Sequence, residues 1–344
     1  MAKVLVTGGS GYFGSILVRK MLEEGEGTRV FDLNEPEGLL DMVEFVQGDI
    51  RRYESVAKAC RGVETVYHCV AQVPLVRDKA LFHSVNVLGT EVLLKAASRA
   101  GVRKTVVLSS SAVYGIPMRN PVDDTAEPKP LEDYGRAKLE AERLAERFHR
   151  RHALDVTIIR PRTILGHGRL GIFHLLFDWI AEGRAVYVLG DGSNLYQLLH
   201  ADDLATACLK ASRRPGFAVY NIGTDRFSSM RESLEGLIAH AGTGSSVRSL
   251  PMRPAALMMK MLSRLRLAPF APYHWIMYGR DLFFDISRAR QELGWQPKWS
   301  NVEMLCQSYD WYVAHRRQLR TNAHTSMHRL PVKEGALRLL RLLS

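Results

Sequence analysis

Tyr134 and Lys138 are the residues of this sequence whose types and spacing most directly suggest chemistry. They lie in the stretch DYGRAK at 133–138, and a spacing of four places both side chains on one face of a helix. Because an ammonium favours a neighbouring phenolate, we expect Lys138 to lower the pKa of Tyr134 towards working pH. Without context, the same spacing on a surface helix is usually only a packed pair.

A glycine-rich stretch at the start of the chain predicts a phosphate-binding turn. TGGSGYFG at 7–14 follows an apolar run and precedes a helical pattern. Gly8 and Gly11 would permit a tight turn and a close approach of the backbone to a pyrophosphate, and Gly14 would let the helix pack against the strand. By itself the stretch also fits an ordinary turn between a strand and a helix.

Asp32 supplies the context that the glycine turn needs. It ends the second strand pattern, 18 residues after Gly14. An acid there accepts a hydrogen bond from an adenosine ribose hydroxyl and repels a 2′-phosphate, which favours NAD over NADP. Leu33 follows it, rather than an arginine, which agrees with NAD. The alternative is a solvated acid at a strand end.

The serines of LSSSAVYG at 108–115 end a further strand pattern. Serines at the carboxyl end of a strand face the crevice where open α/β sheets bind ligands. A serine hydroxyl could hold a substrate oxygen while tyrosine moves the proton and nicotinamide carries a hydride. If the strand continued this far, Ser109 and Ser111 would point away from the face of Ser110.

The elements that must position these residues alternate between strand and helix. We expect strands at 3–6, 28–33, 44–46, 65–69, 104–109 and 156–160, and helices at 14–24, 55–60, 85–100 and 134–151. This rhythm predicts an α/β fold with a Rossmann-type, doubly wound parallel sheet. After Pro161 we expect helices at 172–182, 203–212, 230–241, 255–265 and 288–293, and a strand at 219–223 that returns to the sheet.

Three regions follow from this pattern. We expect an NAD-binding domain at 1–165, with elements near 195–226 returning to it. A smaller substrate domain would occupy 166–315, and a basic tail 316–344, with a flexible linker at 318–332. The tail holds seven Lys and Arg residues against one acid, out of a total net charge of +11.

Composition narrows the class of protein. A chain of 344 residues with 46% hydrophobic residues can bury a large core. Four scattered cysteines without a CxxC pair argue against a disulfide framework or metal site and for a reducing, cytoplasmic location. A charge concentrated in a tail, without a nucleic-acid-binding motif, predicts no nucleic-acid partner.

Together these motifs resemble the extended short-chain dehydrogenase/reductase group, the NAD-dependent epimerase/dehydratase family. The resemblance runs from about residue 3 to 312 and includes GDI at 48–50, VNVLGT at 85–90, RP at 160–161, GDGSNLYQLLHADDLA at 190–205, YNIGT at 220–224 and DISRARQELGWQP at 285–297. It implies NAD as cofactor, a small substrate domain, and often a homodimer built through the helices near 85–100 and 134–151.

The resemblance also implies roles for individual residues. The catalytic set would be Ser110, Tyr134 and Lys138, because relatives place the serine four residues before the tyrosine of a V-Y-G turn; Ser111 is the second choice. Cofactor contacts would come from Gly8, Gly11, Tyr12, Phe13, Gly14, Asp32, Asp49, Ile50, Ala71, Tyr134 and Lys138. Substrate contacts would come from Ser111, Arg162, Thr163, Tyr196 and Arg280. No metal ligand is implied.

The chain departs from its sugar-nucleotide relatives at two positions. They usually have asparagine at the position of Thr163 and an arginine that grips a diphosphate at the position of Tyr196. Arg162 or Arg280 could compensate with bidentate phosphate contacts, or both could be ordinary structural arginines. The 4,6-dehydratase branch has an Asp-Glu pair where this chain has Ser111 and Ala112, so we disfavour dehydration.

Three functions remain open. The first is NAD-dependent hydride transfer at a secondary alcohol or ketone carbon of a sugar nucleotide, as an epimerase or oxidoreductase. The second is the same chemistry on a hydrophobic hydroxy or keto compound, as in enzymes like 3-beta-hydroxysteroid dehydrogenase. The third is a non-catalytic NAD-binding sensor, which would not need the set of Ser110, Tyr134 and Lys138.

Two basic and apolar segments suggest further contacts. Residues 254–268 would line a pocket for a hydrophobic alcohol, meet a membrane surface, or form a buried helix filled by methionines. The amphipathic stretch at 335–344 would dock on its own domain, on a partner subunit or on anionic lipid.

Overall fold

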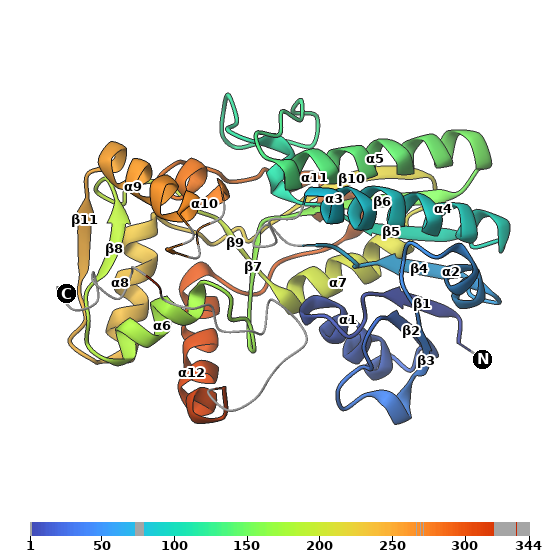
Figure 1. The fold of residues 1–344 in the computed structure, drawn as a ribbon, viewed down its shortest axis with the longest axis horizontal. Coiled ribbons are helices and arrows are strands. Elements are labelled where there is room, and N and C mark those ends of the chain that lie inside the picture. Colours follow the sequence, from blue (N-terminus) through green and yellow to red (C-terminus); the bar gives the residue numbers. More distant parts are fainter. Residues whose placement is uncertain are drawn as a thin grey trace.

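A seven-stranded parallel sheet forms the centre of the N-terminal half of the protein (Figure 1). Its strand order is β10-β6-β5-β4-β1-β2-β3. The strands are β1 (Val4–Thr7), β2 (Thr28–Asp32), β3 (Glu44–Gln47), β4 (Thr65–His68), β5 (Lys104–Leu108), β6 (Asp155–Pro161) and β10 (Phe217–Ile222). This is the Rossmann strand order with one added strand, which confirms the predicted fold class.

The structure is a computed structural model that describes residues 2–72, 79–265, 267–268, 270, 272–319 and 335. The expected linker at 318–332 and the expected helix at 335–344 therefore lie almost entirely outside the described residues.

Helices cover both faces of the sheet, because β1 is apolar on both sides. Val4 and Val6 belong to one buried cluster and Leu5 to another, as alternation along a strand requires. The first cluster includes residues of α1 (Tyr12–Glu23), α7 (Ala201–Ser212) and α11 (Ser287–Leu293). The second includes residues of α2 (Tyr53–Cys60), α4 (Gly89–Arg99) and α5 (Asp133–His152).

The helix expected at 85–100 has a more complex beginning. A short helix, α3 (Lys79–Phe82), runs into a π-helical stretch at His83–Leu88, and only then does α4 start at Gly89. A Cβ atom on Gly89 would lie 2.7 Å from a side-chain carbon of Ile50, so the glycine allows this helix to approach the edge of the sheet. Periodicity alone does not distinguish a π-helical stretch from an α-helix.

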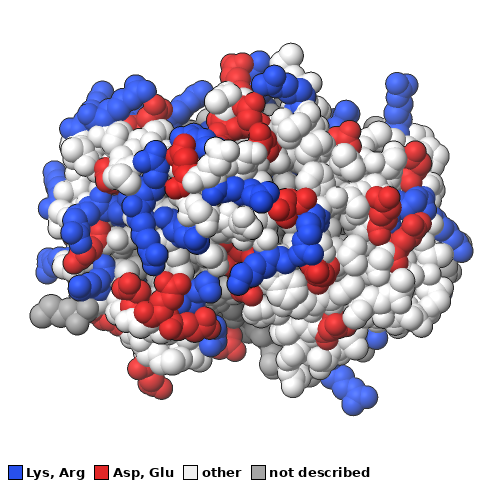
Figure 2. Space-filling model, turned by 180° about the vertical axis from the view of Figure 1, so that it is seen from behind, with Lys and Arg blue, Asp and Glu red and all other residues white. Residues whose placement is uncertain are grey.

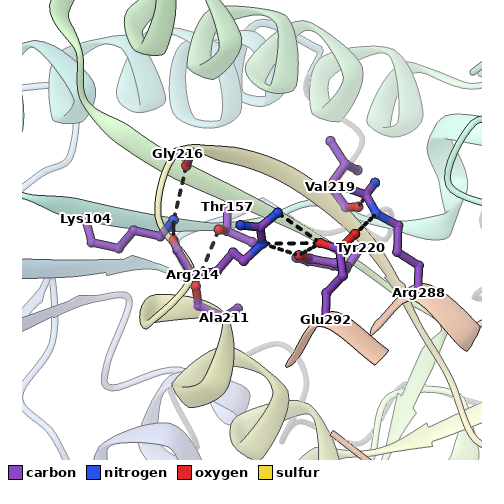
Figure 3. Close-up of polar contacts among 9 residues, drawn as sticks. All are labelled: Lys104, Thr157, Ala211, Arg214, Gly216, Val219, Tyr220, Arg288 and Glu292. Carbon is purple, nitrogen blue, oxygen red and sulfur yellow. Dashed lines mark hydrogen bonds and ion pairs between the residues drawn. The ribbon is translucent and has the colours of Figure 1, made fainter. Parts of the chain in front are cut away.

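The returning strand β10 is fastened at the edge of the sheet by polar contacts (Figure 3). It pairs in parallel with β6, from Phe217 opposite Val156 to Ile222 opposite Pro161. Glu292 of α11 accepts a hydrogen bond from the Tyr220 hydroxyl at 2.6 Å and one from Arg288 at 2.9 Å. These contacts, with that of Arg214, lower the pKa of Glu292 to about 2.

The C-terminal half contains a smaller layer of strands and helices, on the left of Figure 1. It has the parallel pair β8 (Val186–Leu189) and β11 (Val247–Leu250), and the helices α6 (Phe173–Ala181), α8 (Met230–Ala241), α9 (Met252–Arg264), α10 (Pro272–Met277) and α12 (Asn301–Leu319). A second parallel pair joins β7 (Thr163–Leu165), which directly follows β6 in the chain, to β9 (Leu198–His200). The exact boundaries of two domains stay a prediction.

Helix α9 does not line the cavity described below. Some of its apolar side chains, including Ala255 and Met259, belong to a small buried cluster. Others, including Leu257 and Met261, are exposed at the surface. The expectation of a buried helix filled by methionines is therefore met only in part, and contact with a membrane surface stays a prediction. No helix among the described residues is both long and apolar enough to cross a membrane.

On the face shown in Figure 2, Lys and Arg side chains are interspersed with Asp and Glu side chains. Elsewhere among the described residues, ion pairs at least partly open to solvent form along single helices, such as Arg150 with Glu146 and Arg231 with Glu235. Exposed pairs of this kind add little to stability. The expected absence of a nucleic-acid partner stays a prediction.

Candidate active site

The glycine turn between β1 and α1 has the close approaches that the sequence predicts. Gly8 has a φ of +75°, and a Cβ atom on it would lie 2.8 Å from the backbone nitrogen of Val70. A Cβ on Gly14 would lie 2.0 Å from the carbonyl oxygen of Gly8. Both positions thus exclude any side chain, and the amino end of α1 can face a phosphate group.

Asp32 ends β2 beside this turn and its carboxylate is held by backbone donors. Oδ2 accepts a hydrogen bond from the backbone N–H of Ser10 at 3.1 Å, and Oδ1 accepts one from Asn34 at 3.2 Å. Burial raises the pKa of Asp32, and these hydrogen bonds oppose the shift. The carboxylate is therefore fixed in orientation, as recognition of a ribose hydroxyl requires.

A cavity of about 610 Å³ joins the glycine turn to the C-terminal half. Its walls bring together predicted residues that lie far apart in the chain. Those that line it are Gly8, Gly11, Tyr12, Phe13, Gly14, Asp32, Asp49, Ile50, Ala71, Ser110, Ser111, Tyr134, Lys138, Arg162, Thr163 and Tyr196. These residues can accommodate a dinucleotide along the carboxyl edge of the sheet with a substrate beyond it.

Arg280 is the one predicted site residue that does not line this cavity. Its side chain is exposed, and its Nε donates to the carbonyl oxygen of Ile276 at 2.9 Å. Asp49 does line the cavity, but both of its carboxylate oxygens accept hydrogen bonds from Arg51. That pairing lowers the pKa of Asp49.

Helix α5 and the end of β5 place the proposed catalytic set. Tyr134 lies in the first turn of α5, and Lys138 follows one turn later on the same face. The Lys138 ammonium donates to the carbonyl oxygen of Leu108 at 2.7 Å and lies 6.0 Å from the centre of the Tyr134 ring. Ser110 shares a side-chain hydrogen bond with Tyr134. All three side chains line the same cavity.

The expected lowering of the tyrosine pKa is wrong for this structure. Burial raises the pKa of Tyr134 to about 12, and the hydrogen bond with Ser110 and the charge of Arg169 only partly oppose this. Lys138 is itself buried, which lowers its pKa to about 8, although Cys69 and Glu142 act in the other direction. Desolvation disfavours both charged forms, and neither side chain is among the groups that shift the pKa of the other. The phenol is therefore neutral at pH 7.

The condition for an alternation among the three serines is not met, because β5 ends at Leu108. Ser109 turns to the carboxylate of Glu142, and Ser110 caps a short 3₁₀ turn at Ser111–Tyr114 by accepting from the N–H of Ala112. Ser111 lines the same cavity as Ser110. The hydrogen bond between Ser110 and Tyr134 favours Ser110 as the serine nearest the reacting atoms.

Thr163 and Tyr196, the two residues that depart from the sugar-nucleotide pattern, are hydrogen-bonded to each other. The hydroxyls of Thr163 and Tyr196 are 2.9 Å apart, and the Tyr273 hydroxyl lies 3.5 Å from that of Tyr196. The guanidinium of Arg162 lies over the Tyr196 ring, 5.1 Å from its centre. A group of hydroxyls with one neighbouring cation thus replaces the asparagine and arginine expected from the resemblance.

Sequence reasoning missed Arg169 and Tyr273, which also line the cavity. Arg169 lies over the Tyr12 ring at 5.5 Å, and its charge opposes the rise in the pKa of Tyr134. Burial lowers the pKa of Arg169 itself to about 10. Its position soon after the β7 strand, in a loop facing the carboxyl edge of the sheet, is the signal that could have identified it.

Behind the site, a buried ion pair joins α5 to β6. Arg160 donates to Glu142 through Nε at 3.0 Å and through Nη2 at 2.6 Å, and both side chains are almost fully buried. Arg160 also donates to the Tyr114 hydroxyl at 2.7 Å, which in turn donates to Asn221. This network links the helix that carries Tyr134 to the neighbouring strands β6 and β10.

All four cysteines are free thiols in the structure. Across the described residues, no group of three or more His, Cys, Asp or Glu side chains is arranged to hold a metal ion. The expectation that the protein uses no metal stays a prediction.

Comparison with known proteins identifies the family. A model of the NAD dependent epimerase/dehydratase family matches residues 4–223. The uncharacterized protein y4nG of Sinorhizobium fredii is 49% identical over 98% of this chain and 85% of its own length. UDP-glucose 4-epimerase of Mycolicibacterium smegmatis is 28% identical, covering 90% of this chain and 98% of the relative.

A relative that is named for a steroid substrate is equally similar. The 3 beta-hydroxysteroid dehydrogenase/Delta 5-->4-isomerase of Mycobacterium tuberculosis is 28% identical over 97% of this chain and 96% of its own. Among solved structures, the UDP-glucose 4-epimerase of Thermotoga maritima with UDP-glucose aligns with a TM-score of 0.76 and 26% identity, covering 92% of this chain and 99% of that one. MoeE5 in complex with UDP-glucuronic acid and NAD gives 0.74 and 28%, covering 92% and 100%.

Proposed function

Because the chain belongs to the NAD-dependent epimerase/dehydratase family, we propose that it catalyses hydride transfer at a secondary alcohol or ketone carbon of a sugar nucleotide. Its cofactor is NAD. The observation that carries the proposal is the meeting of Ser110, Tyr134 and Lys138 in the cavity that begins at the glycine turn. The reaction is an epimerisation or a net oxidoreduction.

Each residue of the set has a defined task in this proposal. Ser110 holds the substrate oxygen by a hydrogen bond, and Tyr134 gives a proton to that oxygen or takes one from it. The Lys138 ammonium adds positive charge beside the phenol. When bound, oxidised NAD supplies the hydride acceptor, and its positively charged ring further favours the phenolate. A neutral Tyr134 suits proton donation, which is its role when a ketone is reduced.

Cofactor selection is assigned to Asp32. Its fixed carboxylate would accept a hydrogen bond from the adenosine ribose and repel a 2′-phosphate. Gly8, Gly11 and Gly14 would hold the pyrophosphate against the amino end of α1. Dehydration is disfavoured, because the positions that carry an acid pair in 4,6-dehydratases are Ser111 and Ala112, and neither can transfer a proton as a carboxyl group does.

A hydrophobic hydroxy or keto compound is the second candidate substrate. The observation in its favour is the replacement of the two polar sugar-nucleotide markers by the bonded pair of Thr163 and Tyr196. The similarity to a 3 beta-hydroxysteroid dehydrogenase also supports it. In this case NAD would be consumed in each turnover.

The test combines a substrate screen with two variants. Nucleotide sugars and hydroxysteroid-like alcohols are supplied with NAD, and both NADH absorbance and products are followed. An epimerase retains NAD and shows no net NADH, whereas a dehydrogenase needs added NAD and releases NADH. Tyr134→Phe should reduce turnover by about 100-fold or more with NAD affinity unchanged. Tyr53→Phe, at a partly exposed tyrosine on α2, is the matched control. Full activity of Tyr134→Phe would refute the assignment.

We also propose a homodimer formed through α4 and α5, which lie side by side on one face of the sheet (Figure 1). Light scattering should then give twice the chain mass of 38.8 kDa. A single-chain mass at micromolar concentration would contradict this.

A further inference from the structure

Arg162 is a buried cation whose guanidinium is only partly hydrogen-bonded. Its side chain is 1% exposed, and its Nη1 donates to the Ser111 hydroxyl at 3.1 Å. Its Nε and Nη2 have no hydrogen-bond partner among the described residues. The Tyr273 hydroxyl also lies near this guanidinium: burial acts to raise the pKa of Tyr273, but the charge of Arg162 and a side-chain contact with it lower that pKa. The rings of Tyr196 and Phe284 lie 5.1 and 5.6 Å from its central carbon and contact the cation through their faces.

Buried charged donors without acceptors are costly, and most such groups in folded proteins are satisfied. Arg162 lines the cavity that holds the catalytic set, so a ligand can supply what the protein does not. The two unpaired nitrogens lie on one edge of the guanidinium plane. That edge matches the spacing of the two oxygens of a carboxylate, which accept parallel hydrogen bonds from it.

The position of Arg162 sets where such a carboxylate would lie. Its partner Ser111 directly follows Ser110, which is hydrogen-bonded to Tyr134. The guanidinium therefore lies close to the proton-transfer group rather than at a remote end of the cavity. The guanidinium also lies over the ring of Tyr196, whose hydroxyl is hydrogen-bonded to that of Thr163. An anion at this place would adjoin the reacting carbon.

We propose that the Nε and Nη2 edge of Arg162 binds a carboxylate that the substrate carries beside the carbon undergoing oxidation. The substrate class is therefore a hydroxy acid, such as a uronic acid on a nucleotide or a 3-hydroxy acid. This inference rests on the proposed function, which supplies the reacting carbon. If Arg162 instead bound the diphosphate, it would affect acidic and neutral nucleotide sugars alike, because both carry that group. Binding of a carboxylate would affect only the acidic ones.

Binding measurements on the NAD-loaded protein test this without turnover. Calorimetry compares two matched pairs of probes: UDP-glucuronic acid with UDP-glucose, and 3-hydroxyoctanoate with its methyl ester. In the unaltered protein we expect the acid of at least one pair to bind about 10 to 100 times more tightly, as for a buried charge-assisted pair. Arg162→Gln should abolish that preference. Arg280→Gln, which removes an exposed arginine outside the cavity, should retain it.

Three results would overturn the proposal: no preference for either acid in the unaltered protein, a preference that survives Arg162→Gln, or an equal loss for UDP-glucuronic acid and UDP-glucose. The last would assign Arg162 to the diphosphate. If Arg162→Gln does not fold, Arg162→Lys keeps the charge without the two-nitrogen edge and should lose most of the preference. Because only binding is read, a lack of turnover with Tyr134 intact would count against the proposed function and not against this site.

Discussion

The buried pair of Glu142 and Arg160 predicts a large loss of stability when one charge is removed. Glu142→Gln keeps the shape of the side chain but takes away the negative charge that faces two donors of Arg160. It also alters the contact with Ser109, whose hydroxyl donates to the same carboxylate. Arg160 would remain buried, with the Tyr114 hydroxyl as its remaining partner.

The magnitude follows from the two hydrogen bonds between Arg160 and Glu142. Charge-assisted hydrogen bonds at about 1.5 to 3 kcal/mol each give an upper range of about 3 to 6 kcal/mol for the pair. Breaking a buried pair by neutralising one member typically costs about 3 to 5 kcal/mol. We therefore expect Glu142→Gln to lower the free energy of unfolding by about 3 kcal/mol. Because the Glu142 charge also raises the pKa of Lys138, that pKa should fall further.

Urea unfolding followed by circular dichroism measures the change. Glu146→Gln is the matched control, because Glu146 lies on the same helix in an exposed pair with Arg150 and should cost less than about 0.5 kcal/mol. The double variant Glu142→Gln with Arg160→Met removes the stranded cation and should recover part of the loss. A loss below about 1 kcal/mol, or a double variant with fully additive losses, would refute the reasoning.

The lowered pKa of Lys138 makes both activity and stability depend on pH. Lys138→Arg, which stays charged, should remove the loss of activity expected above about pH 8, where Lys138 becomes neutral, and a pH–rate profile shows this. The pKa of Lys138 in the folded protein lies below its unfolded value of 10.5, so between about pH 8 and 10.5 the unfolded chain binds more protons than the folded protein. The contribution of Lys138 to the free energy of unfolding therefore rises with pH in that window. Urea unfolding at several pH values measures this rise. Asp32→Ala should weaken NAD binding and reduce the ratio of the affinity for NAD to that for NADP. Unchanged NAD affinity in a fluorescence titration would disprove this. Gly14→Ala should prevent NAD binding or folding, because its Cβ would meet the Gly8 carbonyl oxygen at 2.0 Å; calorimetry and circular dichroism separate the two. Removing 318–344 should abolish sedimentation with anionic vesicles, and equal, negligible binding with and without these residues would dismiss a membrane contact.

The local patterns of the first half were sufficient to predict much of the fold. The glycine turn and the strand patterns correctly predicted β1, α1 and β2, because buried parallel strands are continuous apolar runs that few other elements imitate. The spacing of Tyr134 and Lys138 correctly placed both on one face of α5. The return of a strand near 219–223 was also predicted, although β10 begins two residues earlier, at Phe217.

Effects that depend on packing could not be predicted from the sequence. The pKa of Tyr134 depends on how completely the site is buried, and spacing alone reports only that Lys138 is near. The direction of Ser111 depends on where β5 ends. Arg280 and Arg162 are equivalent as sequence letters, yet one is exposed and the other is 1% exposed inside the cavity. Contacts between segments far apart in the chain decide each of these cases.

The pairing of β10 with β6 also bears on how the chain acquires its structure during synthesis. β10, one of the two edge strands of the main sheet, is made only after β7, α6, β8, β9 and α7 have emerged. Until then, β6 presents an open edge with unpaired backbone groups, which invites association with other chains. A fragment cut after Pro161 would keep that edge. We therefore expect that the nucleotide-binding half does not fold independently of the rest of the chain. Its sheet is complete only when the chain that follows Pro161 has returned to it at Phe217.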